Sequence, residues 1–333
     1  MRAARLHAAG DVRVGEEPEP AAGAGMSLVR VTAVGICGSD LHWWDEGAIG
    51  DATLAHPLVL GHEGAGVIAE GPRRGERVAI DPAITCGTCR ACRDGYANLC
   101  YRIRFAGHGE TDGMMRELMS WPTELLHPLP DGVCDADGAL LEPLGVALHS
   151  VDLGHLPFGG TASVIGCGPI GLLLIAVLKA AGASSVLAVE PLAHRREAAS
   201  RYGADLVAEP GLADLTGAGV DVAFEAAGGR FGSGDAVRLA LESVRPGGRV
   251  VLAGIPGDDA ITLRASVARR KGLTIAMVRR MNHVYPRAIS LAARGAVDLG
   301  ALVSRRAGLG SVAAAFGDAA DRTGLKVIIE PQR

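Results

Sequence analysis

The sequence is poor in aromatic residues and has no excess of either charge. Aromatic side chains make up 4% of the 333 residues, so the core has to be built from aliphatic side chains. The 33 basic and 37 acidic side chains give a formal net charge of −4, which supplies no positive field for nucleic acid or an anionic membrane. The longest apolar stretch, residues 170–178, is far shorter than the ~20 residues that a membrane span requires.

Other absences narrow the class of protein further. The N-terminal residues lack the apolar run of a signal peptide, and the 47 glycines show no G-x-y period, which excludes a collagen-like protein. Hydrophobic residues make up 48% and charged residues 21%, as in packed globular proteins. At roughly 150 residues per domain, the length predicts about two domains. We expect a cytoplasmic, globular protein that binds neither nucleic acid nor membrane.

The hydrophobic pattern divides the chain into two regimes. Up to about residue 130, short alternating runs between Gly and Pro residues predict β structure. A helix is expected at about 139–151, with Asp137 as its cap. After it, short apolar strands alternate with helices, which is typical of a parallel sheet with right-handed crossovers. The expected strands are 161–166, 185–190, 220–225, 249–253 and 273–278. Strands at 302–304 and 325–329 follow helices near 284–294 and 311–321.

Three glycines form a G-x-G-x-x-G motif between the first expected strand of the second regime and the helix after it. Gly166 permits the tight turn, Gly168 lets backbone amides approach a pyrophosphate, and Gly171 lets the helix pack closely on the strand. The phosphates would lie at the positive end of the helix dipole. The motif therefore predicts a dinucleotide site.

A carboxylate follows this motif at the end of the next strand. Glu190 lies about 20 residues after Gly171, where an acidic side chain binds both ribose hydroxyls of a dinucleotide. A carboxylate there repels a 2′-phosphate and favours NAD over NADP, although Arg195 and Arg196 lie close behind and would weaken that preference. The alternative is a solvated acid at a strand end.

Four of the seven cysteines are clustered. In a reducing compartment such thiols are better interpreted as metal ligands or nucleophiles than as disulfides. Four thiolates at this spacing can close a tetrahedron around Zn²⁺ and leave no open position, which predicts a structural site. An iron–sulfur cluster is the main alternative, but the spacing does not match ferredoxin motifs and no proline follows the last cysteine. The four residues are Cys86, Cys89, Cys92 and Cys100.

A second set of metal-binding residue types is dispersed along the chain. This set comprises Cys37, the neighbouring pair His62 and Glu63, and Glu142. A sulfur, an imidazole and a carboxylate can supply three zinc ligands and leave a fourth position open, as in catalytic sites. Each residue alone has a structural alternative: a buried inert thiol, a capping or core histidine, or a surface acid. Their combination with a dinucleotide motif favours catalysis.

These motifs, in this order and spacing, resemble the zinc-containing medium-chain alcohol dehydrogenases over essentially the whole chain. Residues 35–44, 57–63 and 141–149 are similar to the sorbitol (L-iditol) and L-idonate 5-dehydrogenase branch of that family. The resemblance implies an α/β protein with a GroES-like, β-rich catalytic domain and a Rossmann domain with a doubly wound parallel sheet. The GroES-like domain would span 1–150, with a structural-zinc lobe at about 86–100, and be completed by 288–333. The Rossmann domain would span 151–287.

The resemblance also implies roles for individual residues. Ser39 and His42 match proton-relay positions, and Glu142 would ligate the catalytic zinc directly or act through water and contact substrate. The implied catalytic-zinc ligands are Cys37, His62 and either Glu63 or Glu142. The implied cofactor contacts are Gly166, Gly168, Pro169, Ile170, Gly171, Glu190, Arg195, Ala253, Gly254, Ile255 and Val278.

Substrate contacts are implied for Trp43 and Arg279. The sequence departs from the polyol branch at two positions: Trp43 stands where these enzymes usually have a tyrosine, and Arg280 stands where they have an aromatic residue. A second arginine beside Arg279 would favour an anionic substrate such as a sugar acid.

The expected activity is the reversible oxidation of a secondary alcohol of a polyol or sugar acid to the ketone. It would use NAD, or less readily NADP, and two zinc ions in each chain of a homodimer or homotetramer. One alternative is the same chemistry on another alcohol: threonine, an aminocyclitol or a simple alcohol. Others are a zinc-free quinone or enoyl reductase, which Cys37, His62 and Glu63 argue against, and a non-catalytic NAD-binding protein.

Overall fold

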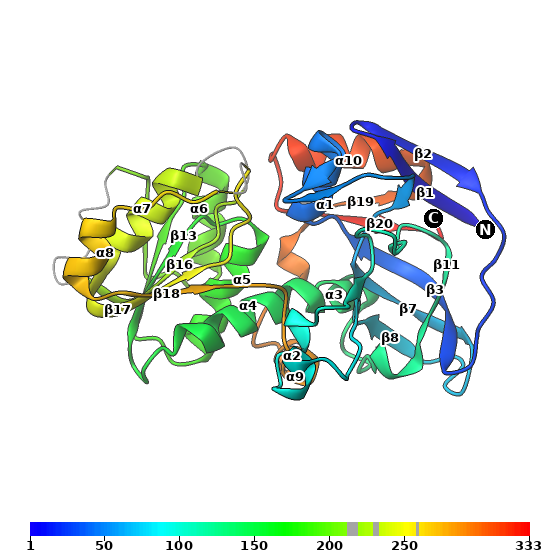
Figure 1. Cartoon of the computed structure of the whole chain (residues 1–333), viewed down its shortest axis with the longest axis horizontal. Helices are drawn as coiled ribbons and strands as arrows, with labels where there is room; N and C mark the ends of the chain where they lie inside the picture. Colours follow the sequence, from blue (N-terminus) through cyan, green and yellow to red (C-terminus); the bar gives the residue numbers. More distant parts are fainter. Residues whose placement is uncertain (212–218, 229–232, 258–259) are drawn as a thin grey trace. The chain divides into compact units, whose positions relative to one another are not determined.

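The computed structural model describes residues 1–211, 219–228, 233–257 and 260–333 (Figure 1). The chain divides into two compact units. Unit 1 comprises Met1–Glu142 and Tyr285–Arg333, and unit 2 comprises Pro143–Val284. The sequence predicts boundaries after residues 150 and 287 instead. The first predicted boundary differs from the observed one, which lies between Glu142 and Pro143. That point is inside one continuous helix, α4 (Leu141–Gly154), where the sequence carries no boundary signal.

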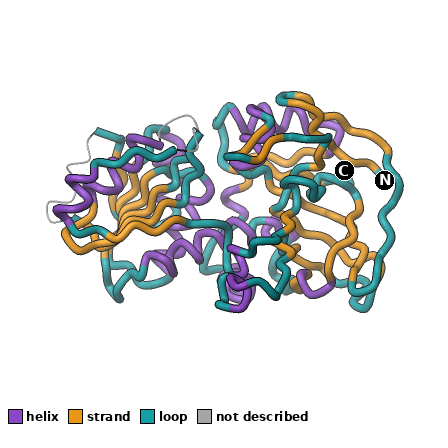
Figure 2. The backbone as a smooth tube through the Cα atoms, in the orientation of Figure 1, coloured by secondary structure: helices purple, strands orange, loops and turns teal. Residues whose placement is uncertain are grey.

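Unit 1 consists mainly of strands (Figure 2). Its largest sheet has the order β12–β8–β7–β3–β20–β19, and β11 also pairs with β3. Smaller sheets have the orders β2–β1–β6, β10–β9 and β4–β5. The strands are β1 (Arg2–Ala8), β2 (Asp11–Glu16), β3 (Met26–Gly35), β4 (Ala48–Ile49), β5 (Ala52–Thr53), β6 (Leu58–Val59), β7 (Glu63–Glu70), β8 (Arg77–Ile80), β9 (Ala83–Ile84), β10 (Arg104–Phe105), β11 (Leu118–Pro122), β12 (Leu126–Pro128), β19 (Val303–Gly308) and β20 (Lys326–Glu330).

Short helices connect these strands. The α-helices are α1 (Gly38–Glu46), α2 (Arg90–Arg93), α3 (Asp135–Ala139), α9 (Tyr285–Ala293) and α10 (Val312–Ala320), and the 3₁₀ helices are η1 (Ala97–Leu99), η2 (Thr123–Leu125), η3 (Gly300–Leu302) and η4 (Leu309–Ser311). The expected cap at Asp137 is wrong. Helix α3 begins earlier, and its N-cap is Cys134, whose Sγ accepts the N–H of Asp137 at 3.4 Å.

Strands from the first and last parts of the chain pair in the largest sheet of unit 1. Strand β20, near the C-terminus, pairs with β3, and β3 pairs on its other side with β7. Gly35 stands opposite Glu63 on β7 and opposite Ile328 on β20. The core beneath is largely aliphatic, with Met114 and Met115 filling part of it. This sheet fixes residues that are far apart in sequence at one end of β3.

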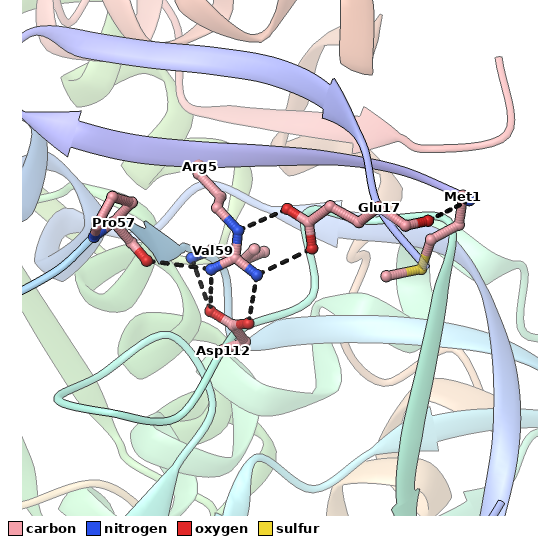
Figure 3. A network of polar contacts seen from close by, with 6 residues as sticks. All are labelled: Met1, Arg5, Glu17, Pro57, Val59 and Asp112. Carbon is pink, nitrogen blue, oxygen red and sulfur yellow. Dashed lines mark hydrogen bonds and ion pairs between the residues drawn. The ribbon is translucent and has the colours of Figure 1, made fainter. Parts of the chain in front are cut away.

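An ion-pair network holds the N-terminal strand in place (Figure 3). The Arg5 guanidinium donates to both carboxylate oxygens of Asp112, at 2.8 and 2.7 Å, and also pairs with Glu17. Asp112 accepts the N–H of Val59 at 3.1 Å. The network joins β1 to β6 through Val59 and to the segment before β11 through Asp112. Strand β6 lies just before His62 in the sequence.

Unit 2 is a parallel six-stranded sheet with the order β15–β14–β13–β16–β17–β18. Numbered within the unit, this is the order 3-2-1-4-5-6 of a dinucleotide-binding fold, whose ligand site lies at the carboxyl ends of the strands where the order reverses. The strands are β13 (Thr161–Ile165), β14 (Ser185–Val189), β15 (Leu206–Ala208), β16 (Val220–Glu225), β17 (Val244–Leu252) and β18 (Thr274–Met277).

Helices accompany this sheet as the alternating pattern predicts. They are α5 (Pro169–Ala180), α6 (Ala193–Arg201), α7 (Ser233–Ser243) and α8 (Ala265–Lys271), with α4 leading in. Apolar residues of α7 pack with Ile165 of β13 and Val250 of β17 in one core cluster. Strand β15 and helix α8 are not among the expected elements, because three and seven residues are too short for a clear period. No helix among the described residues is long and apolar enough to cross a membrane.

Candidate metal centres and dinucleotide site

The four clustered cysteines lie together in unit 1, with all four Sγ atoms within 4.8 Å of one another. The Sγ of Cys89 is 3.5 Å from that of Cys92 and 3.9 Å from that of Cys100. Four sulfur ligands at about 2.3 Å from a tetrahedral zinc ion lie roughly 3.8 Å apart. The observed spacing therefore fits zinc, and four thiolates leave no position for a substrate.

Local backbone groups support these sulfur atoms. The N–H of Cys89 donates to the Sγ of Cys86, and the N–H of Cys86 donates to the Sγ of Cys100, both at 3.3 Å. Backbone hydrogen bonds from Thr88 and Cys89 lower the pKa of the Cys86 thiol to about 5, and Arg102 lies 3.4 Å from the same sulfur. Burial and the neighbouring thiols raise the pKa of Cys92 to about 12, so the low pKa does not extend to all four thiols. A cation is needed to hold all four as thiolates, the metal-binding form.

Cys37, His62 and Glu63 form the second group. Their ligand atoms also lie within 4.8 Å of one another. Cys37 is the N-cap of α1, just after β3. Glu63 is the first residue of the paired strand β7, and His62 immediately precedes it. His62 is 6% exposed and Glu63 is fully buried. A sulfur, an imidazole nitrogen and a carboxylate oxygen form a three-ligand set that suits a catalytic zinc.

The imidazole of His62 is oriented by neighbours from α1. Its Nδ1 lies 3.5 Å from Oδ1 of Asp40, and its Nε2 lies 3.4 Å from the Oγ of Ser39. The Nδ1 side is thus occupied by a carboxylate, and Nε2 is the nitrogen that can reach a metal. His42, further along α1, has its Nδ1 3.6 Å from Oε1 of Glu46.

The glycine motif of unit 2 has the expected backbone geometry. Gly166 has φ +94°, and a Cβ there would lie 2.8 Å from backbone atoms of Ala227. A Cβ on Gly171 would lie only 1.9 Å from the carbonyl oxygen of Gly166, so helix and strand could not approach this closely with any other residue. Gly168 is the N-cap of α5, and Pro169 is its first residue. No side chain caps the amino end of α5, so its first N–H groups are left for a phosphate.

Glu190 lies just after β14 and is held by this loop. Its Oε2 accepts the N–H of Cys167 at 2.7 Å, and its Oε1 accepts the N–H of Leu192 at 3.1 Å. Burial and the nearby Glu190 raise the pKa of Cys167 to about 12, so this thiol is unreactive. Arg195 is buried, and its Nη1 lies 3.7 Å from the position of a Cβ on Gly168. The carboxylate has one fixed orientation beside the motif.

The predicted contacts at residues 253–255 follow β17. The N–H of Ala253 donates to the carbonyl of Glu225 at 2.8 Å, and that of Gly254 lies 3.3 Å from the Glu225 carboxylate. A Cβ on Gly254 would lie 2.7 Å from both Glu225 oxygens. Ile255 is 42% exposed, an unusual position for a large apolar side chain. These residues lie at the carboxyl ends of β16 and β17, the same edge as the glycine motif.

Comparison with known proteins identifies the family of this chain. The chain matches the models for the alcohol dehydrogenase GroES-like domain, over residues 23–131, and for zinc-binding dehydrogenases, over residues 169–294. It is 34% identical to the sorbitol dehydrogenase of Bacillus subtilis, over 100% of this chain and 98% of the relative. The chain belongs to the zinc-binding alcohol dehydrogenase family.

Solved structures place this zinc-binding dehydrogenase in the same fold. L-idonate 5-dehydrogenase from Escherichia coli matches with a TM-score of 0.93 and 27% identity, over 99% of this chain and 97% of that one. A structure from Sinorhizobium meliloti, described as a zinc-binding dehydrogenase bound to NADP, matches with a TM-score of 0.90 and 30% identity, over 99% of each chain. The predicted family and the GroES-like plus Rossmann fold are confirmed.

Glu142 of this dehydrogenase lies near the Cys37 group but outside it. Among the described residues, the atoms within 4.8 Å of one another are those of Cys37, His62 and Glu63. Glu142 is 4% exposed, and burial raises its pKa to about 7, opposed by the charge of His62 and reinforced by that of Glu63. Its carboxyl group therefore takes up and releases a proton near neutral pH.

The predicted substrate contacts differ in their surroundings. Trp43 is 2% exposed and packs in the core, edge to face with His108 at 5.7 Å between ring centroids, which favours a packing role. Val278 extends β18, its N–H donating to Leu252 at 2.9 Å, and Arg279 follows it. Arg280 has φ +57°, a left-handed conformation that a non-glycine residue rarely adopts. The substrate role of Trp43 and Arg279 stays a prediction.

Two residues of the buried centre were missed by the sequence analysis. Asp40 is fully buried and accepts the N–H of Cys37 at 2.9 Å and that of Gly61 at 3.2 Å. Lys326, at the start of β20, donates to both oxygens of Glu63 at 2.8 Å. Burial lowers the pKa of Lys326, but Glu63 and Cys37 raise it more, so the ammonium stays charged. Asp40 lies within residues 35–44, the stretch that resembles the family, so the sequence offered a signal for it. Lys326 lies outside the stretches that carry the resemblance, and no motif pointed to it.

Proposed function

We propose that this protein catalyses the reversible oxidation of a secondary alcohol of a polyol or sugar acid to the ketone, with zinc and NAD. The observation that carries the proposal is the presence, in one chain, of a sulfur–imidazole–carboxylate group, whose imidazole and carboxylate are buried, and a dinucleotide loop with a fixed carboxylate. The similarity to sorbitol dehydrogenase and L-idonate 5-dehydrogenase supports a polyhydroxylated substrate.

Two zinc ions per chain would be held by the two groups of unit 1. Cys37, His62 and Glu63 would hold the catalytic ion, with Glu142 the alternative carboxylate, and the four-cysteine lobe would hold the structural ion. When bound, the catalytic zinc lowers the pKa of the substrate hydroxyl, which makes the carbinol carbon a better hydride donor to nicotinamide.

The chain's own residues then move the proton and exclude water. The Oγ of Ser39 lies 3.4 Å from His62 and is the first acceptor beside the centre, with His42 on the next turn of α1. Asp40 holds the backbone on both sides of the centre, at Cys37 and Gly61, and so fixes their spacing. Burial of His62 and Glu63 removes competing water.

NAD rather than NADP is the proposed nucleotide. Both oxygens of Glu190 are held by backbone N–H groups, so the carboxylate cannot swing away from a 2′-phosphate. The test is the ratio of kcat/KM for NAD to that for NADP, in the wild type and in Glu190→Ser. We expect the wild type to favour NAD and the variant to lose at least tenfold of that preference. A wild type that prefers NADP would refute this assignment.

The substrate is identified by a panel. Sorbitol, xylitol, L-idonate, (2R,3R)-butanediol, myo-inositol and threonine are each tested with NAD and NADP, following nicotinamide reduction at 340 nm. Turnover of sorbitol, xylitol or L-idonate at the highest kcat/KM supports the proposal. Preference for butanediol or threonine supports the same chemistry on another alcohol. Cofactor binding with no turnover of any alcohol would indicate a non-catalytic protein.

A homodimer or homotetramer is the proposed assembly. Strand β18 is an edge of the six-stranded sheet, and Met277 on it is 61% exposed. An exposed apolar edge strand is a template for pairing with a second chain. Light scattering of the purified protein measures the assembly, and a monomer at micromolar concentration would refute it.

A further inference from the structure

Lys326 is a buried cation whose hydrogen-bonding capacity is completely used. Its ammonium donates to the carbonyl of Ile36 at 3.0 Å and to each oxygen of Glu63 at 2.8 Å. The side chains of Lys326 and Glu63 are 3% and 1% exposed. An ammonium has three donors, so all three are satisfied at this position. Glu63 therefore has a counter-ion that the chain itself supplies.

The absence of a side chain at Gly35 leaves room for this carboxylate. A Cβ on Gly35 would lie 2.0 Å from Oε2 of Glu63, so the carboxylate rests directly on the Gly35 backbone. Gly35 stands opposite Glu63 in the β3–β7 pair and next to β20 through Ile328. Glu63 is thus fixed between a glycine on one side and the ammonium on the other.

The choice of lysine is unusual for this chain. Only three of its 33 basic residues are lysines. Lys179 pairs with Asp205 at the surface of unit 2, and Lys271 donates to three carbonyls at the end of α7. A compact ammonium suits three acceptors around one point, whereas a planar guanidinium needs a wider site. The three acceptors around residue 326 therefore fit a lysine ammonium better than an arginine guanidinium.

We propose that Lys326 is a positioning residue that serves as the permanent counter-ion of Glu63 and competes with zinc for that carboxylate. A buried carboxylate without a cation is strongly unfavourable. With Lys326 present, the centre keeps its structure in the absence of zinc. The Glu63 carboxylate then binds zinc more weakly than an unpaired carboxylate would. The proposal depends on the proposed function only in assigning zinc to the Cys37 group.

The test compares Lys326→Met with the wild type, each as full chain, either metal-depleted or loaded with zinc. Thermal melting gives the stability of both forms, and titration against a chromophoric chelator gives the zinc affinity of the site beyond the four-cysteine lobe. We expect the variant to lower Tm in the metal-depleted protein clearly more than in the zinc-loaded one. We also expect its zinc affinity at that site to increase about tenfold or more.

Matched variants separate charge from packing. Lys179→Met removes a surface lysine and should change both forms equally. Lys326→Arg keeps the charge in a wider group, so it should lower Tm in both metal states without raising the zinc affinity as Lys326→Met does. If metal-depleted Lys326→Met does not fold, adding Glu63→Gln removes the unpaired carboxylate and should restore folding. Failure of that double variant to recover would overturn the proposal.

Two results distinguish this proposal from the proposed function. Equal loss of Tm in both metal states, or weaker zinc binding by Lys326→Met, would overturn the counter-ion role alone. A wild type that takes up zinc only at the four-cysteine lobe would overturn the proposed function, and the counter-ion role with it. Neither measurement depends on turnover.

Discussion

The two cysteine-containing centres of unit 1 are built in opposite ways. The four-cysteine lobe takes all its ligands from Cys86–Cys100, and three of the four are only half-buried. The second centre takes Cys37 from the turn after β3, His62 from the residue before β7 and Glu63 from the start of β7. Its supporting charge, Lys326, comes from a strand 263 residues away from Glu63.

This difference in construction implies a different role for the metal at each centre. A lobe whose ligands and hydrogen bonds are local gains its order from the metal, as small zinc modules do. A centre whose residues are placed by paired strands gains its order from the sheet, so the metal is free to act on a substrate. The variants below test this division.

The largest effect is expected for Cys37→Ser. Removing the thiolate from a three-ligand set should reduce kcat/KM about 1,000-fold or more, because the catalytic ion is lost or misplaced. NAD affinity, measured by quenching of protein fluorescence, should stay within about twofold, since the dinucleotide loop belongs to unit 2. Full activity in metal-depleted wild type would contradict the assignment.

Cys89→Ser should act on stability instead. Three remaining thiolates hold zinc poorly, and we expect the free energy of unfolding to fall by about 3 kcal/mol or more, with one zinc ion lost per chain. Urea denaturation and elemental analysis measure both. Turnover of the molecules that stay folded should change less than threefold. Lost turnover at unchanged stability would show that the two centres had been assigned the wrong way round.

Asp40→Asn tests how the sheet-built centre is held. The variant keeps one acceptor oxygen, enough for the N–H of Cys37, but loses the acceptor for the N–H of Gly61 and the charge beside Nδ1 of His62. Changes at such supporting residues cost about 10- to 100-fold in metal affinity. Chelator competition should show that loss, while the four-cysteine lobe keeps its zinc. Asp94→Asn, beside that lobe, is the control and should leave both affinities unchanged.

How much of the molecule could be predicted depended on how local each feature is. The glycine motif, Glu190 and the four cysteines are each determined by a short stretch, and the structure brings the residues of each together. The parallel sheet followed from alternating apolar strands and helices. The Cys37 group was predictable only as a combination of separate motifs.

The missed features depend on long-range pairing or on very short elements. Lys326 is a single lysine at the start of an apolar strand, and nothing in its own segment distinguishes a buried lysine from a surface one. Its role exists only because β20 pairs with β3. Asp40 acquires its role from Gly61, which folding alone brings near it. The helix start at Asp135 was missed because Cys134, an uncommon cap, precedes it.

The smallest effect is expected for Asp81→Asn, which probes the charge balance near the buried centre. Burial raises the pKa of Asp81 from 3.8 to about 6, and its Oδ1 accepts the N–H of Ala83 at 3.0 Å, a bond that an asparagine oxygen can keep. Because the folded pKa is above the unfolded one, folding favours the protonated form, and the wild type loses stability as pH rises from about 4 through 6. The variant cannot ionise, so its gain should be near zero at pH 4 and reach about 2–3 kcal/mol above pH 6.5. Urea denaturation across this range measures the difference, and a gain that does not vary with pH would contradict the assignment.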